Sequence, residues 1–339
     1  MTVLPLLAAL LLSAGCGGGS TGARATGAGA TGAGGGATGA SGGAGGVTLT
    51  IYAAGTLVRP FQEIDRAFEA AHPGVHVQAQ FGGSVKEVKQ VTELGQPADV
   101  VAVADYSVIP RLMFGQGGGK VFADWYVGFA TNAITFVYTA RSRGAERINA
   151  SNWYEVLAEP GVQIGRSNPD TDPSGYQTLE MLQLASKYYG QPDLERKVLA
   201  NAPMTNVRDT ETELLSALEA GQIDYLAIYE SDARQHGLKY VPLPPQINLS
   251  DARFARAYAA ARVQTKSGLL TGKPIVYAVT IPTNAPHPEL ARQWVAFLLT
   301  EGRTVLARDG FGLPAKPMAS DVGKVPEELR DDVEPWPAG

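Results

Sequence analysis

Four short segments of this 339-residue chain place small or hydroxyl-bearing residues where an expected strand gives way to an expected helix. A helix begins with backbone N–H groups that lack a partner within the helix and with a partial positive charge, so each junction could contact an anion. For any one junction alone, the alternative is an ordinary helix cap. In doubly wound sheets such loops gather at the carboxyl ends of the strands, where ligands bind. The four junctions are Ala54-Gly55-Thr56, Gly82-Gly83-Ser84, Asp172-Pro173-Ser174 and Asp209-Thr210-Glu211.

The first two junctions belong to an alternation of short β-rich runs and amphipathic helices, which predicts parallel α/β architecture. Ser84 and Glu87 have the spacing of a capping box. The expected strands cover residues 47–53, 75–81 and 98–104, and the expected helices cover residues 57–72 and the segment from Ser84.

A second unit is expected to begin near Ala133, and the other two junctions lie in it. Thr210 and Glu213 have the spacing to cap its last helix. A strand over 274–282 and a helix over 287–300 are expected to return to the first unit, and two crossings between α/β lobes make a hinge. We predict an α/β fold with lobe I formed by residues 47–132 plus 278–339 and lobe II by residues 133–277. The expected elements of lobe II are strands over 134–138, 162–165 and 225–229 and helices over 174–189 and 210–220.

Composition excludes several classes of protein. The net charge is -5, and without a run rich in Lys or Arg the chain does not resemble a nucleic-acid binder. No apolar run after residue 20 approaches the ~20 residues that span a bilayer. A single cysteine excludes an internal disulfide framework and a multi-cysteine metal site. From Val47 onward the chain has no GxSxG, HExxH or CxxC motif, so we expect no enzyme activity.

The N-terminus indicates export. An apolar stretch from Val3 to Leu12 precedes Ser13-Ala14-Gly15-Cys16, which resembles the lipobox of a bacterial lipoprotein, so residues 1–16 are a predicted signal peptide and Cys16 a predicted lipidation site. The segment before the apolar stretch lacks a cation and Ser13 stands where Leu is usual, which leaves an ordinary secretory signal as the alternative. Residues 17–46 are almost entirely Gly, Ala, Ser and Thr and predict a flexible tether.

Several ordered motifs between about Leu49 and Ala315 resemble one family, the periplasmic molybdate/tungstate-binding proteins of ABC transporters, and within this ModA-like family the WtpA-type branch. The resemblance implies a type II periplasmic-binding-protein fold and a monomeric protein, held outside the cytoplasm by its lipid anchor, that passes molybdate or tungstate to a permease without a further cofactor. The motifs are Ala54-Gly55-Thr56-Leu57, His72-Pro73-Gly74-Val75, Thr92-Glu93-Leu94-Gly95, Ala104-Asp105-Tyr106, Ala123-Asp124-Trp125-Tyr126, Ser167-Asn168-Pro169, Asp172-Pro173-Ser174-Gly175-Tyr176, Gly221-Gln222-Ile223-Asp224-Tyr225-Leu226 and Pro274-Ile275-Val276-Tyr277.

The same resemblance implies roles for individual residues. Gly55, Thr56 and Ser84 of lobe I would contact the oxyanion, and lobe II would add the backbone N–H of Ser174 and the hydroxyl of Tyr229. In the WtpA-type branch two carboxylates bind the metal centre of the anion.

Those carboxylates correspond to Asp172 and Glu211. Two negative side chains should repel a dianion unless they coordinate its centre directly. Mo(VI) or W(VI) can expand from four to six oxygen ligands, whereas sulfur in sulfate and phosphorus in phosphate cannot. The register leaves Glu213 as the alternative second ligand, although its capping position frees Glu211 to face the cleft.

Three rival functions remain open. A sulfate or phosphate binder would be the nearest, and the two carboxylates argue against it. Tyr188-Tyr189 could suggest a ferric-ion binder, but both residues are expected to end a helix. A sensor or an enzyme could use the same two-lobed fold, since fold alone does not fix function.

Overall fold

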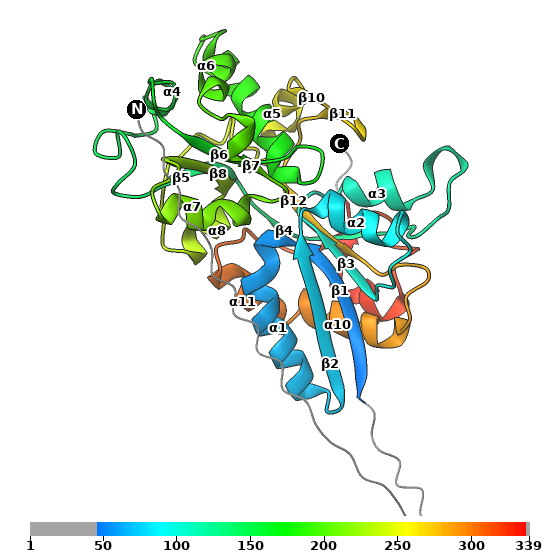
Figure 1. Cartoon of the computed structure of the whole chain (residues 1–339). Helices are drawn as coiled ribbons and strands as arrows, with labels where there is room; N and C mark the ends of the chain where they lie inside the picture. Colours follow the sequence, from blue (N-terminus) through cyan, green and yellow to red (C-terminus); the bar gives the residue numbers. More distant parts are fainter. Residues whose placement is uncertain (1–45, 337–339) are drawn as a thin grey trace, which may run out of the picture. The chain divides into compact units, whose positions relative to one another are not determined.

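Two β-sheets organise residues 46–336, the part of the chain that the computed structural model describes (Figure 1). The predicted signal peptide, Cys16 and the tether through residue 45 lie outside the described residues. Among the residues described, no helix has both the length and the apolar character needed to cross a bilayer.

The larger sheet has seven strands in the order β14-β13-β4-β12-β3-β1-β2. The end formed by β3, β1 and β2 is parallel, because β1 pairs with both β2 and β3 in the same direction, while the central strand β12 runs antiparallel to β3 and β4. The strands are β1 (Val47–Ala54), β2 (Val75–Gly82), β3 (Val100–Val103), β4 (Val127–Thr131), β12 (Val276–Thr280), β13 (Met318–Ala319) and β14 (Glu334–Pro335).

Helices pack on this sheet through apolar stripes. Helix α1 runs alongside β1 and β2 (Figure 1) and buries Phe61, Ile64 and Phe68. Phe61 meets Trp294 of α10 edge to face, with ring centroids 5.1 Å apart. Each such side chain contributes about 1.5–3 kcal/mol through burial. The elements are η1 (Gly55–Leu57), α1 (Val58–Ala71), α2 (Ser84–Thr92), α3 (Val108–Met113), η2 (Gln116–Gly118), α10 (Pro288–Leu299), α11 (Gly302–Arg308) and η6 (Glu327–Asp332).

The smaller sheet has five strands in the order β7-β6-β8-β5-β9. These are β5 (Ile134–Tyr138), β6 (Ile164–Ser167), β7 (Val207–Arg208), β8 (Tyr225–Tyr229) and β9 (Lys239–Tyr240). A separate hairpin of β10 (Arg262–Thr265) and β11 (Gly268–Thr271), which the sequence did not predict, lies beside this sheet's helices.

The helices around the smaller sheet include α5, whose N-terminal turn carries the third junction. They are α4 (Trp153–Leu157), α5 (Pro173–Tyr188), α6 (Leu194–Ala200), η3 (Met204–Asn206), η4 (Glu211–Leu214), α7 (Leu215–Glu219), α8 (Glu230–Gln235), η5 (Ala252–Phe254) and α9 (Ala255–Tyr258). The predicted helix over 210–220 is therefore a 3-10 turn followed by a short α-helix.

Both predicted capping boxes are wrong. Gly83 is the N-cap of α2, so Ser84 lies inside the helix, and the Glu87 carboxylate accepts a hydrogen bond from Gln80 instead of turning back to the helix start. Thr210 does precede η4, but its hydroxyl donates to the Glu211 carboxylate and caps no backbone N–H. In both cases a hydrogen bond to another side chain replaces the expected capping bond.

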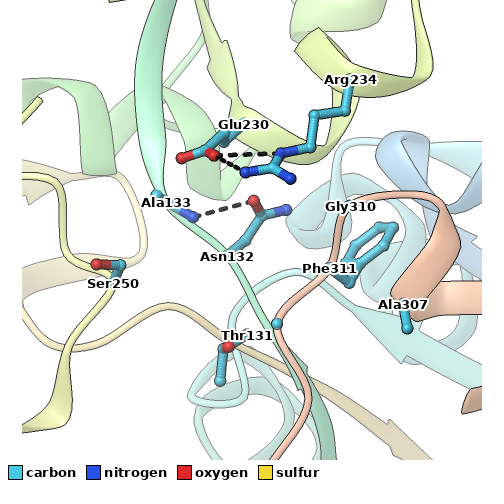
Figure 2. A pocket seen from close by; sticks show the side chains of 10 residues that line it. Thr131, Asn132, Ala133, Glu230, Arg234, Ser250, Ala307, Gly310 and Phe311 are labelled. Atoms are coloured by element: carbon cyan, nitrogen blue, oxygen red, sulfur yellow. Dashed lines mark hydrogen bonds and ion pairs between the residues drawn. The ribbon is translucent and has the colours of Figure 1, made fainter. Parts of the chain in front are cut away.

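The chain passes from the larger sheet to the smaller between Thr131 and Ile134 and re-enters the larger sheet at Val276. We keep the names lobe I and lobe II for the parts that carry these sheets; the boundaries at 133 and 277 stay predictions. Asn132 fills the first crossing: its Oδ1 accepts a hydrogen bond from the Ala133 N–H at 2.9 Å (Figure 2). A cavity of about 290 Å³ lies at this crossing and contains none of the predicted site residues.

Candidate functional site

The N-terminus of α5 is built by Asp172. This residue is the N-cap, its Oδ1 accepts a hydrogen bond from the Ser174 N–H at 3.2 Å, and Pro173 occupies the first helical position, where a missing N–H costs nothing. The carboxylate that caps the helix is only 4% exposed. The Ser174 N–H predicted to contact the anion therefore donates to Asp172 in this structure.

One hydroxyl joins the two predicted carboxylates. Ser174 Oγ lies 2.8 Å from Glu211 Oε2 and 3.4 Å from Asp172 Oδ2. Ser167 Oγ lies 2.6 Å from Ser174 Oγ. Thr210 Oγ1 also donates to Glu211 Oε2, at 3.1 Å. Glu211 is 1% exposed, whereas Glu213 is exposed, so only Glu211 shares this cluster.

The carboxylates form a region of unbalanced negative charge. Burial raises the pKa of Asp172 well above its ordinary value, and the neighbouring Glu211 carboxylate raises it further. Burial and the charge of Glu211 likewise raise the pKa of Asp232, whose side chain is buried. Within residues 46–336, no Lys or Arg forms an ion pair with any of the three.

Lobe I brings its two junctions against these loops. A Cβ atom on Gly55 would lie 3.0 Å from Thr210 Oγ1, and one on Gly83 would lie 2.5 Å from the Thr171 carbonyl oxygen. That second separation is too short for any side chain, so glycine is required there. The N–H groups of Val85 and Lys86, at the start of α2, donate to the same Thr171 carbonyl at 3.1 and 3.2 Å. The two lobes are therefore in direct contact at the predicted site.

The two predicted hydroxyl groups of lobe I are buried and already form hydrogen bonds within the protein. Thr56 Oγ1 lies 2.8 Å from the hydroxyl of Tyr277, and Ser84 Oγ accepts a hydrogen bond from the Ala104 N–H at 3.0 Å. An oxyanion that contacted them would have to compete with these bonds or share them.

Tyr229 ends strand β8 beside the carboxylates. Its hydroxyl donates to Gln177 Oε1 at 2.7 Å. Burial raises the pKa of Tyr229 well above its ordinary value, with further contributions from Tyr277, Asp172 and Glu211. The phenol thus stays protonated and keeps a proton to donate.

The sequence prediction missed three polar residues around the cluster. Asn132 Nδ2 donates to the Tyr277 hydroxyl at 3.2 Å and to Ser231 Oγ at 2.8 Å, which links the hinge to Thr56. Asp232 Oδ2 is buried without a hydrogen-bond partner among the described residues. Asp232 and Gly55 line a cavity of about 290 Å³. Tyr277 belongs to the Pro274-Ile275-Val276-Tyr277 motif, but nothing in the spacing of Tyr277, Asn132 or Asp232 assigned these residues to a site.

Within residues 46–336 there is no cluster of three or more His, Cys, Asp or Glu side chains arranged to hold a metal ion. Asp172 and Glu211 lie among hydroxyl groups at the N-terminus of α5.

Comparisons with known proteins agree with the fold. A family model described as bacterial extracellular solute-binding protein matches residues 49–312. An uncharacterized solute-binding protein of Petrotoga mobilis is 40% identical over 84% of this chain and 89% of its own length. The molybdate/tungstate-binding protein WtpA of Pyrococcus abyssi is 37% identical over 84% of this chain and 90% of its own.

Among solved structures, the periplasmic molybdate-binding protein of Azotobacter vinelandii superposes with a TM-score of 0.58 at 18% identity, over 78% of this chain and 99% of its own. This likeness confirms the predicted periplasmic-binding-protein fold.

Proposed function

Because the chain belongs to the bacterial extracellular solute-binding proteins, we propose that it captures molybdate or tungstate outside the cytoplasm and delivers the anion to an ABC permease. The 37% identity to the molybdate/tungstate-binding protein of Pyrococcus abyssi supports this choice of ligand. The observation that carries the proposal is the buried pair Asp172 and Glu211, which Ser174 joins and which has no Lys or Arg partner within residues 46–336.

We propose that this pair coordinates the metal centre of the anion. A carboxylate oxygen from each residue would raise the coordination of Mo(VI) or W(VI) from four to six, which converts two repulsive charges into ligands. The sulfur of sulfate and the phosphorus of phosphate cannot accept two further oxygen ligands, so the two carboxylates would only repel these anions. The two side chains would then supply both affinity and selectivity.

The remaining predicted residues would bind the oxo groups. Gly55, Thr56 and Ser84 from lobe I and Ser174 and Tyr229 from lobe II would donate from backbone and hydroxyl groups. Closure of the lobes would remove water and strengthen each of these bonds. We further propose that Cys16 carries a lipid anchor and that the protein acts as a monomer.

Thermal unfolding tests the ligand. Molybdate or tungstate at ~1,000 times its dissociation constant should stabilise the native state by about 4 kcal/mol, because only the folded protein binds it. Sulfate and phosphate at the same concentrations should leave the melting temperature unchanged. A shift with sulfate or phosphate and none with either oxometalate would overturn the proposal in favour of an ordinary oxyanion binder.

A paired substitution tests the coordination. Glu211→Gln keeps the shape of the side chain but removes the anionic ligand, and Glu213→Gln makes the same change two residues away at an exposed position. Isothermal titration should show weakened oxometalate binding in Glu211→Gln only. Equal affinity in the two variants would exclude the six-coordinate arrangement.

A further inference from the structure

Another buried carboxylate, Asp105, connects the two lobes and is not one of the predicted site residues. Asp105 follows strand β3 and is 1% exposed. Its carboxylate accepts hydrogen bonds from the Tyr176 hydroxyl at 2.7 Å and the Ser107 N–H at 2.9 Å, and Lys273 Nζ lies 3.0 Å away.

The partners of Asp105 come from different parts of the fold. Tyr176 belongs to α5 of lobe II, while Lys273 lies in the segment that leads back into β12 of lobe I. One carboxylate therefore joins the end of β3, the first turns of α5 and the second crossing between the lobes.

From this arrangement we infer that Asp105, Tyr176 and Lys273 form a latch that holds the closed lobes together and sets how long the ligand stays bound. Among the described residues, none of the three side chains forms a hydrogen bond or ion pair with a predicted ligand-binding residue, so they are positioning residues. The inference rests on the proposed function for the identity of the ligand. The latch itself rests on the contacts alone.

Tyr176 and Asp105 each lie within a few residues of a predicted site residue along the chain. Tyr176 lies two residues after Ser174 and four after Asp172, at the start of the same helix. Asp105 directly follows Ala104, whose N–H donates to Ser84 Oγ. Holding Tyr176 against Asp105 therefore holds the α5 N-terminus against the α2 N-terminus.

The bond between Tyr176 and Asp105 is made only while the lobes touch. Lys273 keeps the carboxylate charged, so the hydroxyl donates to an anion, and such bonds are stronger than bonds between neutral groups. Opening the cleft would replace the bond by water on both sides. Its loss should consequently act on the dissociation rate of the ligand more than on its association rate.

Tyr176→Phe tests the latch, because it removes one hydroxyl and keeps the buried ring. Tyr225→Phe is the matched control: Tyr225 is also fully buried, and its hydroxyl donates to the Arg143 carbonyl oxygen within lobe II. Stopped-flow fluorescence with molybdate should show dissociation about tenfold faster in Tyr176→Phe, with association changed by less than about twofold. The Tyr225→Phe variant should match the parent protein, and a dissociation rate in Tyr176→Phe equal to that of the control would overturn the latch.

A measurement without ligand separates this inference from the proposed function. Leu94 in lobe I and Met204 in lobe II are 66% and 73% exposed, so cysteines there can carry spin labels in a full-length chain with Cys16 replaced by Ser. Double electron–electron resonance should find a larger share of long interlobe distances in Tyr176→Phe than in Tyr225→Phe. Identical distributions would overturn the latch. A parent protein that binds neither molybdate nor tungstate would overturn the proposed function and leave this comparison intact.

Discussion

Two groups of buried carboxylates lie where the lobes meet, and they differ in charge balance. Asp172 and Glu211 share hydrogen bonds from hydroxyl groups and have no cation among their partners in the described chain. Asp105 is equally buried but has Lys273 at 3.0 Å. The first group has no Lys or Arg partner among the described residues, whereas the second has one. The two groups therefore differ in their ion pairing and not in their burial.

The two groups also predict opposite responses to pH. Burial raises the pKa of Asp172, so this residue stabilises the unliganded fold below its unfolded pKa near 4, and that stability is lost as the pH rises. Burial acts in the same direction on Asp105, but Lys273 and the two hydrogen-bond donors outweigh it and lower the pKa of Asp105. Its stabilisation is present above the unfolded pKa and is lost as the pH falls through the folded pKa.

The largest effect is expected from removing the cation of the balanced group. Lys273→Met leaves the Asp105 charge buried with only hydrogen-bond donors, and breaking a buried pair in this way costs about 3–5 kcal/mol. Urea unfolding at neutral pH should show that loss of stability.

Lys266→Met is the control for that measurement. Lys266 also pairs with an aspartate, Asp170 at 3.7 Å, but its side chain is 83% exposed, so its removal should cost less than about 1 kcal/mol. Equal losses in the two variants would mean that Lys273 does not balance a buried charge.

In the group of Asp172 and Glu211, removing a charge is expected to change the stability of the unliganded protein by less, and to raise it. Asp172→Asn should weaken molybdate binding by at least about 100-fold, or about 3 kcal/mol, because an amide replaces a charged ligand. The same change should raise the stability of the unliganded protein at neutral pH and flatten its dependence on pH above about 4. Unfolding in urea from pH 4 to pH 8 and titration calorimetry measure the two effects. A variant that is less stable than the parent at every pH would show that Asp172 is ionised and satisfied without ligand.

Much of the fold and part of the site could be predicted from the sequence because their signals are local. The strands over 134–138 and 225–229 match β5 and β8 to the residue, since apolar runs that fill a buried sheet end where the burial ends. The hairpin of β10 and β11 was missed because its two four-residue strands carry little apolar pattern.

The site, too, has residues that local sequence signals indicated and residues that they did not. The junctions at Gly55, Ser84, Asp172 and Glu211 were visible as small and polar residues between periodic segments, and the structure brings all four segments together. The bond between Asp105 and Tyr176 joins residues 71 positions apart, and nothing in the spacing of either segment indicates it. The two predicted capping boxes are wrong because the spacing of residues does not show which side chains compete for a hydrogen bond. Glu87 accepts one from Gln80, and Thr210 donates one to Glu211, so neither caps a helix.

The smallest effect is expected at another interlobe contact, which is exposed. Lys86 Nζ lies 2.9 Å from Asp209 Oδ2, and the two side chains are 45% and 44% exposed. Water and salt screen such a pair, so it contributes about 0.2–1 kcal/mol. Lys86→Ala should therefore raise the molybdate dissociation constant by less than about fivefold at low ionic strength, and the difference from the parent should vanish in 0.5 M salt. A larger effect that persists in salt would place Lys86 with the buried carboxylates, as a cation that acts on the ligand itself, and would remove the contrast between balanced and unbalanced groups.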